Sequence, residues 1–395
     1  MASRRRIKRK MKKLWWILLP FILLFVLLVL FFKFNYHSKN VDNPKSTVEE
    51  KEEVKVPKVY EAKVFMVGDA LIHSGVYLDA LQSDGSYDFK PMLQYIKPIV
   101  SKYDLKYYNQ ETILGGKELG YSNYPRFNSP NEVGDAFLDA GFNLVSLATN
   151  HTMDKGEAGV INSVNYWKSK ENVVSSGQWT SYEDRDQVRI YDINGISYAF
   201  FSYTTWTNGV ETPVGKEYLN NVYFPEKAAN DIAKVRDLAD VIIVAMHWGT
   251  EYSLNVSQQQ TEIANYLSSL GVNLIIGAHP HVVEPVEYIN DGKTFVIYSL
   301  GNFISAQVGI ERLTGLMMEV TIKKIVDIDD SVTISIEEPK ADLTYTHTDN
   351  YKNFRVYPYS KLDNVLLPNY MSYYEYYKGI VSSRYPELIW GLSGE

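Results

Sequence analysis

The sequence predicts an α/β domain built on a β-sheet. From Ala62 onward, short apolar runs are separated by longer stretches with helical periodicity, which is the order of elements in α/β proteins. Several runs are continuously apolar instead of alternating, as is typical of strands covered on both faces. The predicted strands are 63–68, 105–109, 143–149, 196–203, 241–246, 273–277 and 294–299.

Predicted helices lie between these strands, and several of their ends carry cap signals. Asn131 stands where it can cap the second helix, and Gly141 and Gly271 stand where C-terminal glycine caps belong. Two later runs, 315–325 and 331–336, show β-branched alternation and extend the sheet. The tail from Leu343 has little periodicity, and we expect it to pack over the domain. The predicted helices are 91–101, 131–140, 158–170, 225–238 and 257–270.

The composition excludes several classes of protein and site. The chain of 395 residues has no cysteine, which rules out a disulfide scaffold, a thiolate zinc site, an iron–sulfur cluster and a cysteine nucleophile. The net charge is -7, but residues 1–13 alone carry eight positive charges and no acid, so the remaining residues carry -15. A nucleic-acid partner is therefore not expected, because binding of phosphate needs a basic surface on the folded part.

An apolar stretch follows the basic N-terminus. Residues 14–32 hold no charge and would form a helix of about 28 Å, long enough to cross a hydrocarbon core. We therefore expect a cytoplasmic segment at 1–13, a transmembrane anchor at 14–34, and the rest outside the cell. The alternative is a cleaved signal peptide, although no small-residue cleavage site follows. The sequence predicts a solvated linker at residues 35–61. It also predicts the main domain at 62–330 and a C-terminal extension at 331–395.

Polar residues follow the predicted strands at their carboxyl ends, where α/β sheets bind ligands. Each residue alone has an ordinary explanation as a turn former, a helix cap or a satisfied polar side chain. Together they indicate a metal site, because four of the seven histidines fall at such ends with carboxylate and amide groups. This ligand set suits one or two divalent ions of Mn, Fe or Zn better than Ca²⁺. The residues are Asp69, Glu111, Asn150, His151, His247, His279 and His281.

A series of motifs resembles the CapA family of poly-γ-glutamate capsule biosynthesis proteins. The motifs are VGD (67–69), NQET (109–112), YPRFNSP (124–130), ATNHTMDKG (148–156), MHWGTEY (246–252), GAHPHVVEPVE (277–287) and YSLGNF (298–303). The family in turn resembles calcineurin-like metallophosphoesterases. The resemblance implies two facing mixed β-sheets flanked by helices, a four-layer sandwich, here preceded by one transmembrane helix.

The resemblance also implies a role for each site residue. Asp69 matches the first metal-ligand aspartate, Glu111 the metal-bridging carboxylate and Asn150 the amide ligand. His247, His279 and His281 match the imidazole ligands, and His151 matches the histidine that assists the leaving group.

Two positions depart from the superfamily pattern. Leu71 stands two residues after Asp69, where the superfamily has a histidine, and Glu111 stands where it has an aspartate. His73 is a candidate replacement for the missing imidazole. These departures leave the number of bound metals open.

Three functions remain open at this point. The first is a membrane-anchored, metal-dependent, hydrolase-like protein that processes or exports the anionic polymer, with Arg126 and Asn302 as candidate substrate contacts. The second is a surface metallophosphoesterase with an unrelated phosphodiester or phosphomonoester substrate. The third is a non-enzymatic protein that assembles or anchors the membrane subunits of a capsule synthetase.

Overall fold

The computed structural model describes residues 23–33 and 56–392. The chain divides into two compact units, Met1–Lys55 and Val56–Glu395. In the first unit, residues 23–33 are helical. Among the residues described, no helix combines the length and the apolar character needed to span a membrane. The predicted segment 1–13, residues 14–22 and 34 of the predicted anchor, and residues 35–55 of the predicted linker lie outside the described residues.

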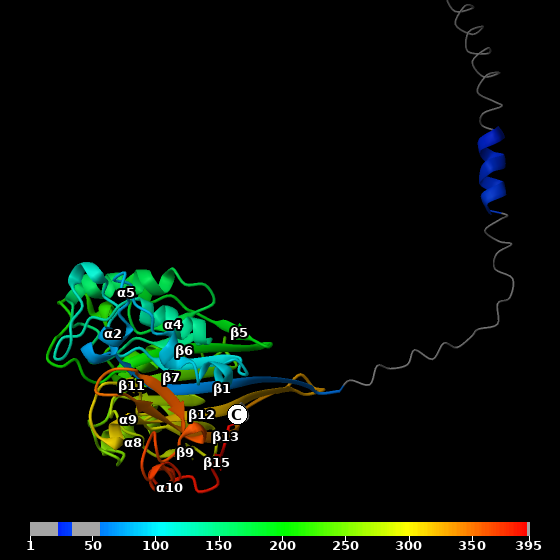
Figure 1. Cartoon of the computed structure of the whole chain (residues 1–395). Helices are drawn as coiled ribbons and strands as arrows, with labels where there is room; N and C mark the ends of the chain where they lie inside the picture. The colour runs from blue at the N-terminus through cyan, green and yellow to red at the C-terminus, as the bar shows by residue number, and fades with distance from the viewer. Residues whose placement is uncertain (1–22, 34–55, 393–395) are drawn as a thin grey trace, which may run out of the picture. The chain divides into compact units, whose positions relative to one another are not determined.

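The second unit contains two mixed β-sheets (Figure 1). The larger sheet has the strand order β14-β13-β12-β1-β2-β3-β4, while β11 also pairs with β1 and β15 with β13. Strands β1 to β4 are parallel, whereas β12 is antiparallel to β1 and to β13. The strands are β1 (Lys58–Leu71), β2 (Leu105–Asn109), β3 (Leu144–Ser146), β4 (Val174–Ser176), β11 (Asn302–Ser305), β12 (Thr314–Val326), β13 (Val332–His347), β14 (Arg355–Pro358) and β15 (Ile389–Trp390).

The smaller sheet has the order β5-β6-β7-β8-β10-β9. Its central strands β6, β7, β8 and β10 are parallel, and the two edge strands are antiparallel to their neighbours. The strands are β5 (Tyr191–Ile193), β6 (Ile196–Thr204), β7 (Val241–His247), β8 (Leu274–Ala278), β9 (Val286–Ile289) and β10 (Thr294–Ile297).

Helices cover the outer faces of both sheets. The longer ones are α2 (Ser74–Ala80), α4 (Glu132–Ala140), α5 (Gly156–Lys168), α7 (Pro225–Ala233), α8 (Gln258–Ser269) and α10 (Tyr370–Val381). Single turns are α3 (Lys97–Val100), α6 (Tyr182–Arg185) and α9 (Ile310–Leu313), with 3₁₀ turns at Lys90–Leu93, Lys117–Leu119, Glu217–Leu219 and Tyr359–Lys361.

Successive side chains along a strand point to opposite faces of the sheet, so each strand contacts both the other sheet and the helices. In β1, Val64 and Met66 lie in the core between the two sheets, while Phe65 lies in a separate cluster with the helices α3 and α4. In β7, Ile243 faces the same inter-sheet core and Val244 contacts α7 and α8. Both faces of these strands are therefore buried, which is why their sequences are continuously apolar.

The predicted α/β class is confirmed, and the predicted strands fall within or overlap β1, β2, β3, β6, β7, β8 and β10. Three details differ. The predicted linker ran to 61, but β1 begins at Lys58. The predicted helix 91–101 is two short turns, because Pro91 and Pro98 each start a turn. Asn131 stands at the N-cap of α4, but its side chain makes no cap hydrogen bond.

The C-terminal residues belong to the same compact unit. The expected boundary after residue 330 lies in the turn between β12 and β13, which pair along most of their lengths. The tail from Leu343 also contains α10, a helix that the sequence did not reveal. Tyr377 and Val381 of this helix are buried in the inter-sheet core. The tail therefore forms part of the wall of the core.

Candidate metal centre and active-site cleft

The candidate residues come together where the parallel strands of both sheets end. Asp69 lies near the end of β1, Glu111 two residues after β2, and His247 is the last residue of β7. Asn150 and His151 follow β3, and His279 and His281 follow β8. Because the carboxyl ends of parallel strands meet at one sheet edge, residues up to 212 positions apart share a site.

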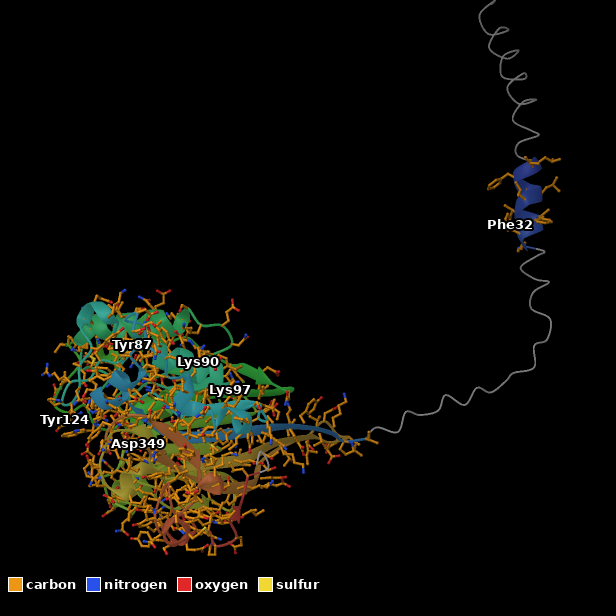
Figure 2. All side chains as sticks on the ribbon, in the orientation of Figure 1. Phe32, Tyr87, Lys90, Lys97, Tyr124 and Asp349 are labelled. Atoms are coloured by element: carbon orange, nitrogen blue, oxygen red, sulfur yellow. The ribbon has the colours of Figure 1, made fainter. Side chains whose placement is uncertain are left out.

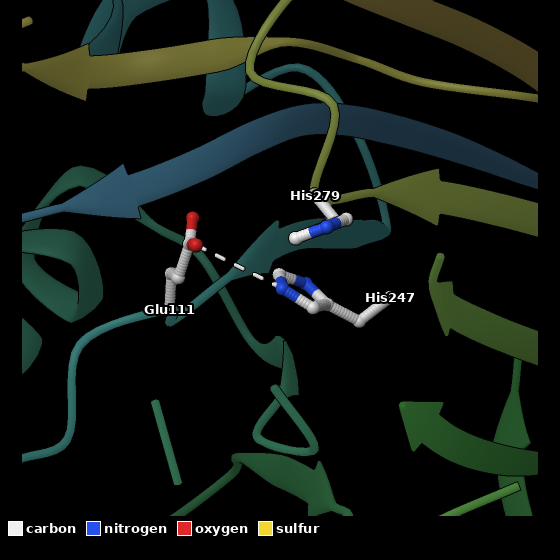
Figure 3. A group of neighbouring side chains, drawn as sticks. All are labelled: Glu111, His247 and His279. Carbon is white, nitrogen blue, oxygen red and sulfur yellow. Dashed lines mark ion pairs between the residues drawn. The ribbon is translucent and has the colours of Figure 1, made fainter. Parts of the chain in front are cut away.

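Glu111 belongs to two groups of side chains that could each hold a metal ion. One group is Glu111, His247 and His279, and the other is Asp69, Glu111 and His281. In each group the ligand atoms lie within 4.8 Å of one another. Figure 3 shows the first group, with His247 Nε2 at 3.8 Å from Glu111 Oε1. His281 Nε2 approaches the same oxygen at 3.6 Å. A shared carboxylate between two imidazole-containing groups is the arrangement of a bridged pair of metal positions.

The hydrogen bonding of Glu111 tests whether a cation fits. Glu111 is 1% exposed, and neither of its side-chain oxygens has a hydrogen-bond partner. Burial, followed by the charge of Asp69, holds the pKa of Glu111 well above its usual range. His279 Nδ1 is also buried without a partner. Buried polar atoms are rarely left unpaired, so a divalent ion is the partner that would satisfy both residues.

Burial favours the neutral form of His247 and His279, the form that binds metal. Burial, followed by the neighbouring His279, holds the pKa of His247 well below its usual range. Burial lowers the pKa of His279 to about 3, and His281 adds to this shift. Neutral imidazoles keep a lone pair for a metal ion without first losing a proton.

Neighbouring side chains orient His281. Its Nδ1 donates to Asn302 Oδ1 at 3.0 Å and to Asp69 Oδ2 at 3.2 Å, so the lone pair of Nε2 is directed towards Glu111. Instead of facing the cleft as expected, Asn302 is fully buried and also donates to Gln307 and to the Arg312 carbonyl. Asn302 therefore orients His281.

The backbone carries strain at the same place. His279 has φ of +97° and His281 has φ of +61°, in the left-handed region that side chains with a β-carbon avoid. Gly68 allows β1 to approach the next chain closely, since a β-carbon there would lie 1.8 Å from the Gly301 carbonyl oxygen. This close approach lets Asp69 N donate to Gly301 O at 2.9 Å. The backbone is thus fixed on both sides of the candidate site.

Asn150 and His151 face different partners although they are adjacent. Asn150 Oδ1 lies 3.0 Å from His247 Nε2, on the side of the metal group. His151 Nδ1 donates to Asp154 Oδ2 at 2.7 Å, and Asp154 also accepts from Phe127 N. The Phe127 ring stands edge-on to His151 with centroids 4.7 Å apart. His151 therefore belongs to a buried dyad with Asp154.

The departures from the expected pattern are visible in the structure. Leu71 is buried and its carbonyl accepts from His73 Nδ1 at 3.1 Å. The His73 ring is also edge-on to Phe127, and within the described residues it belongs to neither metal group. Burial lowers its pKa to about 4. His73 thus lies near the site, but nothing in its contacts makes it a substitute ligand.

A cleft of about 680 Å³ opens above the dyad. Of its lining residues, His151, Asp154 and His279 are buried, whereas Arg126 and Tyr124 are exposed. Tyr124 is 72% exposed and projects from the surface of the unit (Figure 2). Arg126, expected as a substrate contact, therefore stands where it can meet a ligand. The other lining residues are Pro125, Thr205, Trp206, Asn208, Gly209, Val210, Gly249, Thr250, Glu251 and Gln259.

Three residues of the site were not singled out from the sequence. Asp154 follows His151 by one helical turn, a spacing that could have suggested a dyad. Asn109 donates to Asp69 Oδ1 at 2.9 Å and is visible in the NQET motif. Asn208 accepts from Asn150 Nδ2 at 3.2 Å, but it lies in a loop that carries no sequence signal.

Comparison with protein families gives one match along the main unit. The model of the family described as Bacterial capsule synthesis protein PGA_cap matches residues 63–307. Two curated relatives are similar to the chain. The PGA biosynthesis protein CapA of Bacillus subtilis (strain 168) is 26% identical over 272 residues, which is 65% of this chain and 67% of the relative. The Capsule biosynthesis protein CapA of Bacillus anthracis is 28% identical over 258 residues, 61% of this chain and 59% of the relative.

Solved structures with a related arrangement are more distant. A novel phosphatase of Mycoplasma pneumoniae aligns with 78% of this chain and 99% of its own, at 14% identity and a TM-score of 0.46. A putative 5'-nucleotidase from Staphylococcus aureus, in complex with alpha-ketoglutarate, aligns with 75% of this chain and 54% of its own, at 17% identity and a TM-score of 0.44.

Proposed function

The chain belongs to the PGA_cap family of bacterial capsule synthesis proteins, and on this premise we propose that it is a metal-dependent, hydrolase-like component of poly-γ-glutamate capsule biosynthesis, processing or export. One observation carries the proposal. Glu111, buried and without a hydrogen-bond partner, is shared by two groups of neutral imidazole and carboxylate ligands beside an open cleft. A purely structural protein gains nothing from such an unpaired carboxylate.

The ligand roles follow from the geometry. Asp69, Glu111 and His281 would hold one ion, and Glu111, His247 and His279 a second, with Asn150 Oδ1 as a further ligand of the latter. The ions would be Mn, Fe or Zn. When bound, a divalent ion supplies Lewis acidity at the oxygen of the reacting group.

His151 supplies the proton chemistry in this proposal. Because its Nδ1 donates to Asp154, the ring is held in one orientation, and Nε2, which lies 3.4 Å from Asn208 Nδ2, is the atom that would act on a substrate in the cleft. In the protonated form, Nε2 gives its proton to the leaving atom as the bond to that atom breaks. Asp154 stabilises the charged ring before the transfer.

Arg126 provides positive charge at the mouth of the cleft. Among the described residues that line the cleft, it is the one lysine or arginine, and Asp154 and Glu251 are acidic. A polymer of glutamate units would need both Arg126 and the bound ions to offset this negative charge. The partners we propose are therefore the anionic polymer itself or the membrane subunits of its synthetase, and not nucleic acid.

We propose a location outside the cell, with residues 14–34 as a membrane anchor and 1–13 in the cytoplasm. The support is the uncharged stretch 14–32 and the eight basic residues before it. Of this stretch, residues 23–32 are described, and all of them are exposed in an apolar helix. Protease added to intact cells should remove the unit 56–392, whereas protection of that unit would contradict the topology.

A second candidate function is a surface metallophosphoesterase with a different substrate. The observation that favours it is the combination of two metal positions with a cation, Arg126, across the cleft, since this combination also suits a phosphate group. A role in assembly without catalysis is less well supported, because such a role does not need the His151–Asp154 dyad.

The test is metal analysis of the purified full-length chain together with a substrate screen. We expect at least one Mn, Fe or Zn ion for each chain, and cleavage of a γ-glutamyl amide in preference to bis(p-nitrophenyl) phosphate. Preference for the phosphodiester would favour the second candidate. A chain that holds no divalent ion would contradict both.

A further inference from the structure

The loop between β6 and the 3₁₀ turn Glu217–Leu219 forms one wall of the cleft. Its residues Trp206, Asn208 and Val210 line the cleft, as Tyr124 also does. The loop is held at both ends. At the start, Thr205 N donates to the carbonyl of the candidate ligand His247 at 2.9 Å. At the far end, the Lys216 ammonium contacts both carboxylate oxygens of Glu157 in α5, at 2.7 and 2.6 Å.

Asn208 is the residue of this loop whose side chain contacts Asn150 and His151. Its Oδ1 accepts two hydrogen bonds, from Asn150 Nδ2 at 3.2 Å and from Trp206 Nε1 at 2.8 Å. Its Nδ2 lies 3.4 Å from His151 Nε2. Asn208 has φ of +52°, a conformation that asparagine tolerates better than most residues. A strained backbone in a loop is expected where the side chain has a fixed task.

The contact with Asn150 determines which way the amide of Asn150 faces. An amide has an oxygen on one side and a nitrogen on the other. When Asn150 Nδ2 donates to Asn208, Asn150 Oδ1 is left on the side of His247 Nε2, at 3.0 Å. If the amide turned over, Nδ2 would face the metal group and could not bind a cation.

We propose that Asn208 is a positioning residue that keeps Asn150 Oδ1 directed at the metal group, and that Trp206 holds Asn208 in place for this task. The inference rests on the proposed function, since it requires Asn150 to be a ligand. Trp206 is 57% exposed, and the one polar atom of its indole, Nε1, donates to Asn208 Oδ1. The loop thus contributes to metal affinity although it supplies no ligand.

The test is a double-mutant cycle between Asn208 and Asn150 in the full-length chain, with Mn²⁺ affinity measured by calorimetry. Asn208→Ala should weaken Mn²⁺ binding about tenfold, the lower end of the usual effect of losing a partner that orients a ligand. Asn150→Asp keeps an oxygen toward the ion but has no N–H group to orient. In that background, Asn208→Ala should change the affinity less than twofold.

Two matched variants separate positioning from a general disturbance of the loop. Asn208→Asp keeps the acceptor for Asn150 and Trp206, so its affinity for Mn²⁺ should not fall below wild type. Thr207→Ala changes the neighbouring residue of the same loop and should leave the affinity unchanged. Trp206→Phe keeps the ring but loses the donor, and it should weaken binding in the same direction as Asn208→Ala, by a smaller factor.

The outcomes that overturn the inference are distinct from failure of the proposed function. If the wild-type chain binds no Mn²⁺, Fe or Zn, the proposed function fails and this inference falls with it. If the wild type binds Mn²⁺ and Asn208→Ala binds it equally well, only the inference is wrong. Equal losses in Asn208→Ala and Thr207→Ala, or equal losses of Asn208→Ala in both backgrounds, would also reject it.

Discussion

Two glutamates in this protein, Glu111 and Glu284, are equally buried but differ in their hydrogen bonds. Glu111 and Glu284 are both at most 1% exposed, and burial raises the pKa of each. Gln260 Nε2 donates to Glu284 Oε2 at 2.6 Å, whereas neither oxygen of Glu111 receives a hydrogen bond. Burial and a raised pKa therefore do not by themselves distinguish a functional carboxylate from a structural one.

The difference between the two lies in the groups around them. One oxygen of Glu284 accepts from a neutral amide, which favours its ionised form, while its other oxygen is buried without a partner. Glu111 faces the imidazoles of His247 and His281, together with the carboxylate of Asp69. Lone pairs and a negative charge cannot satisfy a carboxylate, but they and Glu111 together can satisfy a divalent cation. The comparison of these two residues indicates that the role of a buried acid depends on the groups around it more than on its pKa.

The largest expected effect is that of Glu111→Gln. Removing the carboxylate shared by both groups should lower metal affinity by about 10³-fold, equivalent to about 4 kcal/mol for a lost buried charge partner. Activity should fall below detection. With a chelator present, both proteins lack the metal. Glu111→Gln should then unfold at a higher temperature than wild type, because it no longer buries an unpaired carboxyl group. Calorimetric metal titration and thermal unfolding with and without chelator give both values.

Glu284→Gln is the matched control, since it makes the same chemical change at an equally buried position. It should bind metal as wild type does. Equal loss of metal in the two variants would mean that both act through the fold, and the distinction between the two glutamates would then be wrong.

The second prediction separates proton chemistry from metal binding. His151→Ala should retain metal near the wild-type level while the turnover of a substrate found by the screen falls by about 10² to 10⁴. His279→Ala should lose metal as well, because His279 lies in the group of Glu111 and His247. Metal content by elemental analysis and turnover under saturating metal report the two effects. Parallel loss of metal in both variants would make His151 a ligand or a structural brace.

The third and smaller effect concerns Asp154. Asp154→Asn should lower turnover by about 10- to 100-fold, the usual result of losing a carboxylate that orients a reactive histidine. The variant keeps an oxygen that can accept from His151 Nδ1, but it no longer stabilises the protonated ring. Turnover is compared with that of Glu251→Gln, which removes the other acidic group of the cleft and makes no hydrogen bond or ion pair with His151 within the described residues. A larger effect from Glu251→Gln would reject the dyad.

Much of the fold followed from local sequence patterns, because its strands are short apolar runs with polar residues at their ends. The runs at 105–109 and 241–246 correspond closely to β2 and β7. The helix α10 was missed, since five of its twelve residues are tyrosines and it shows no clear apolar stripe. The two prolines that divide the predicted helix 91–101 were present in the sequence but were outweighed by its apolar residues.

The sequence predicted which residues gather at the candidate site, but not the contacts that orient them. Glu111 and the histidines are recognisable because their residue types are rare at strand ends. Asn302 was expected to face the substrate, but it pairs with His281 in the interior because β11 lies beside β1. Asn208 reaches Asn150 across 58 positions through a loop. Contacts of this kind depend on how the two sheets face each other, which no local pattern encodes.

The last prediction concerns the pH dependence of stability at Glu284. Burial raises its pKa to about 8 in the folded protein, whereas an exposed glutamate titrates near 4.5. Between these values the folded protein keeps the proton and the unfolded chain releases it. The stability that the raised pKa contributes is therefore fully present below about pH 4.5 and is lost as the pH rises through about 8.

Glu284→Gln cannot ionise, and its amide oxygen can still accept from Gln260. The variant should match wild type near pH 4 and exceed it by about 1 to 3 kcal/mol at pH 8.5, as urea unfolding would measure. Parallel curves for Glu284→Gln and wild type over this range would show that Glu284 is already ionised in the folded protein.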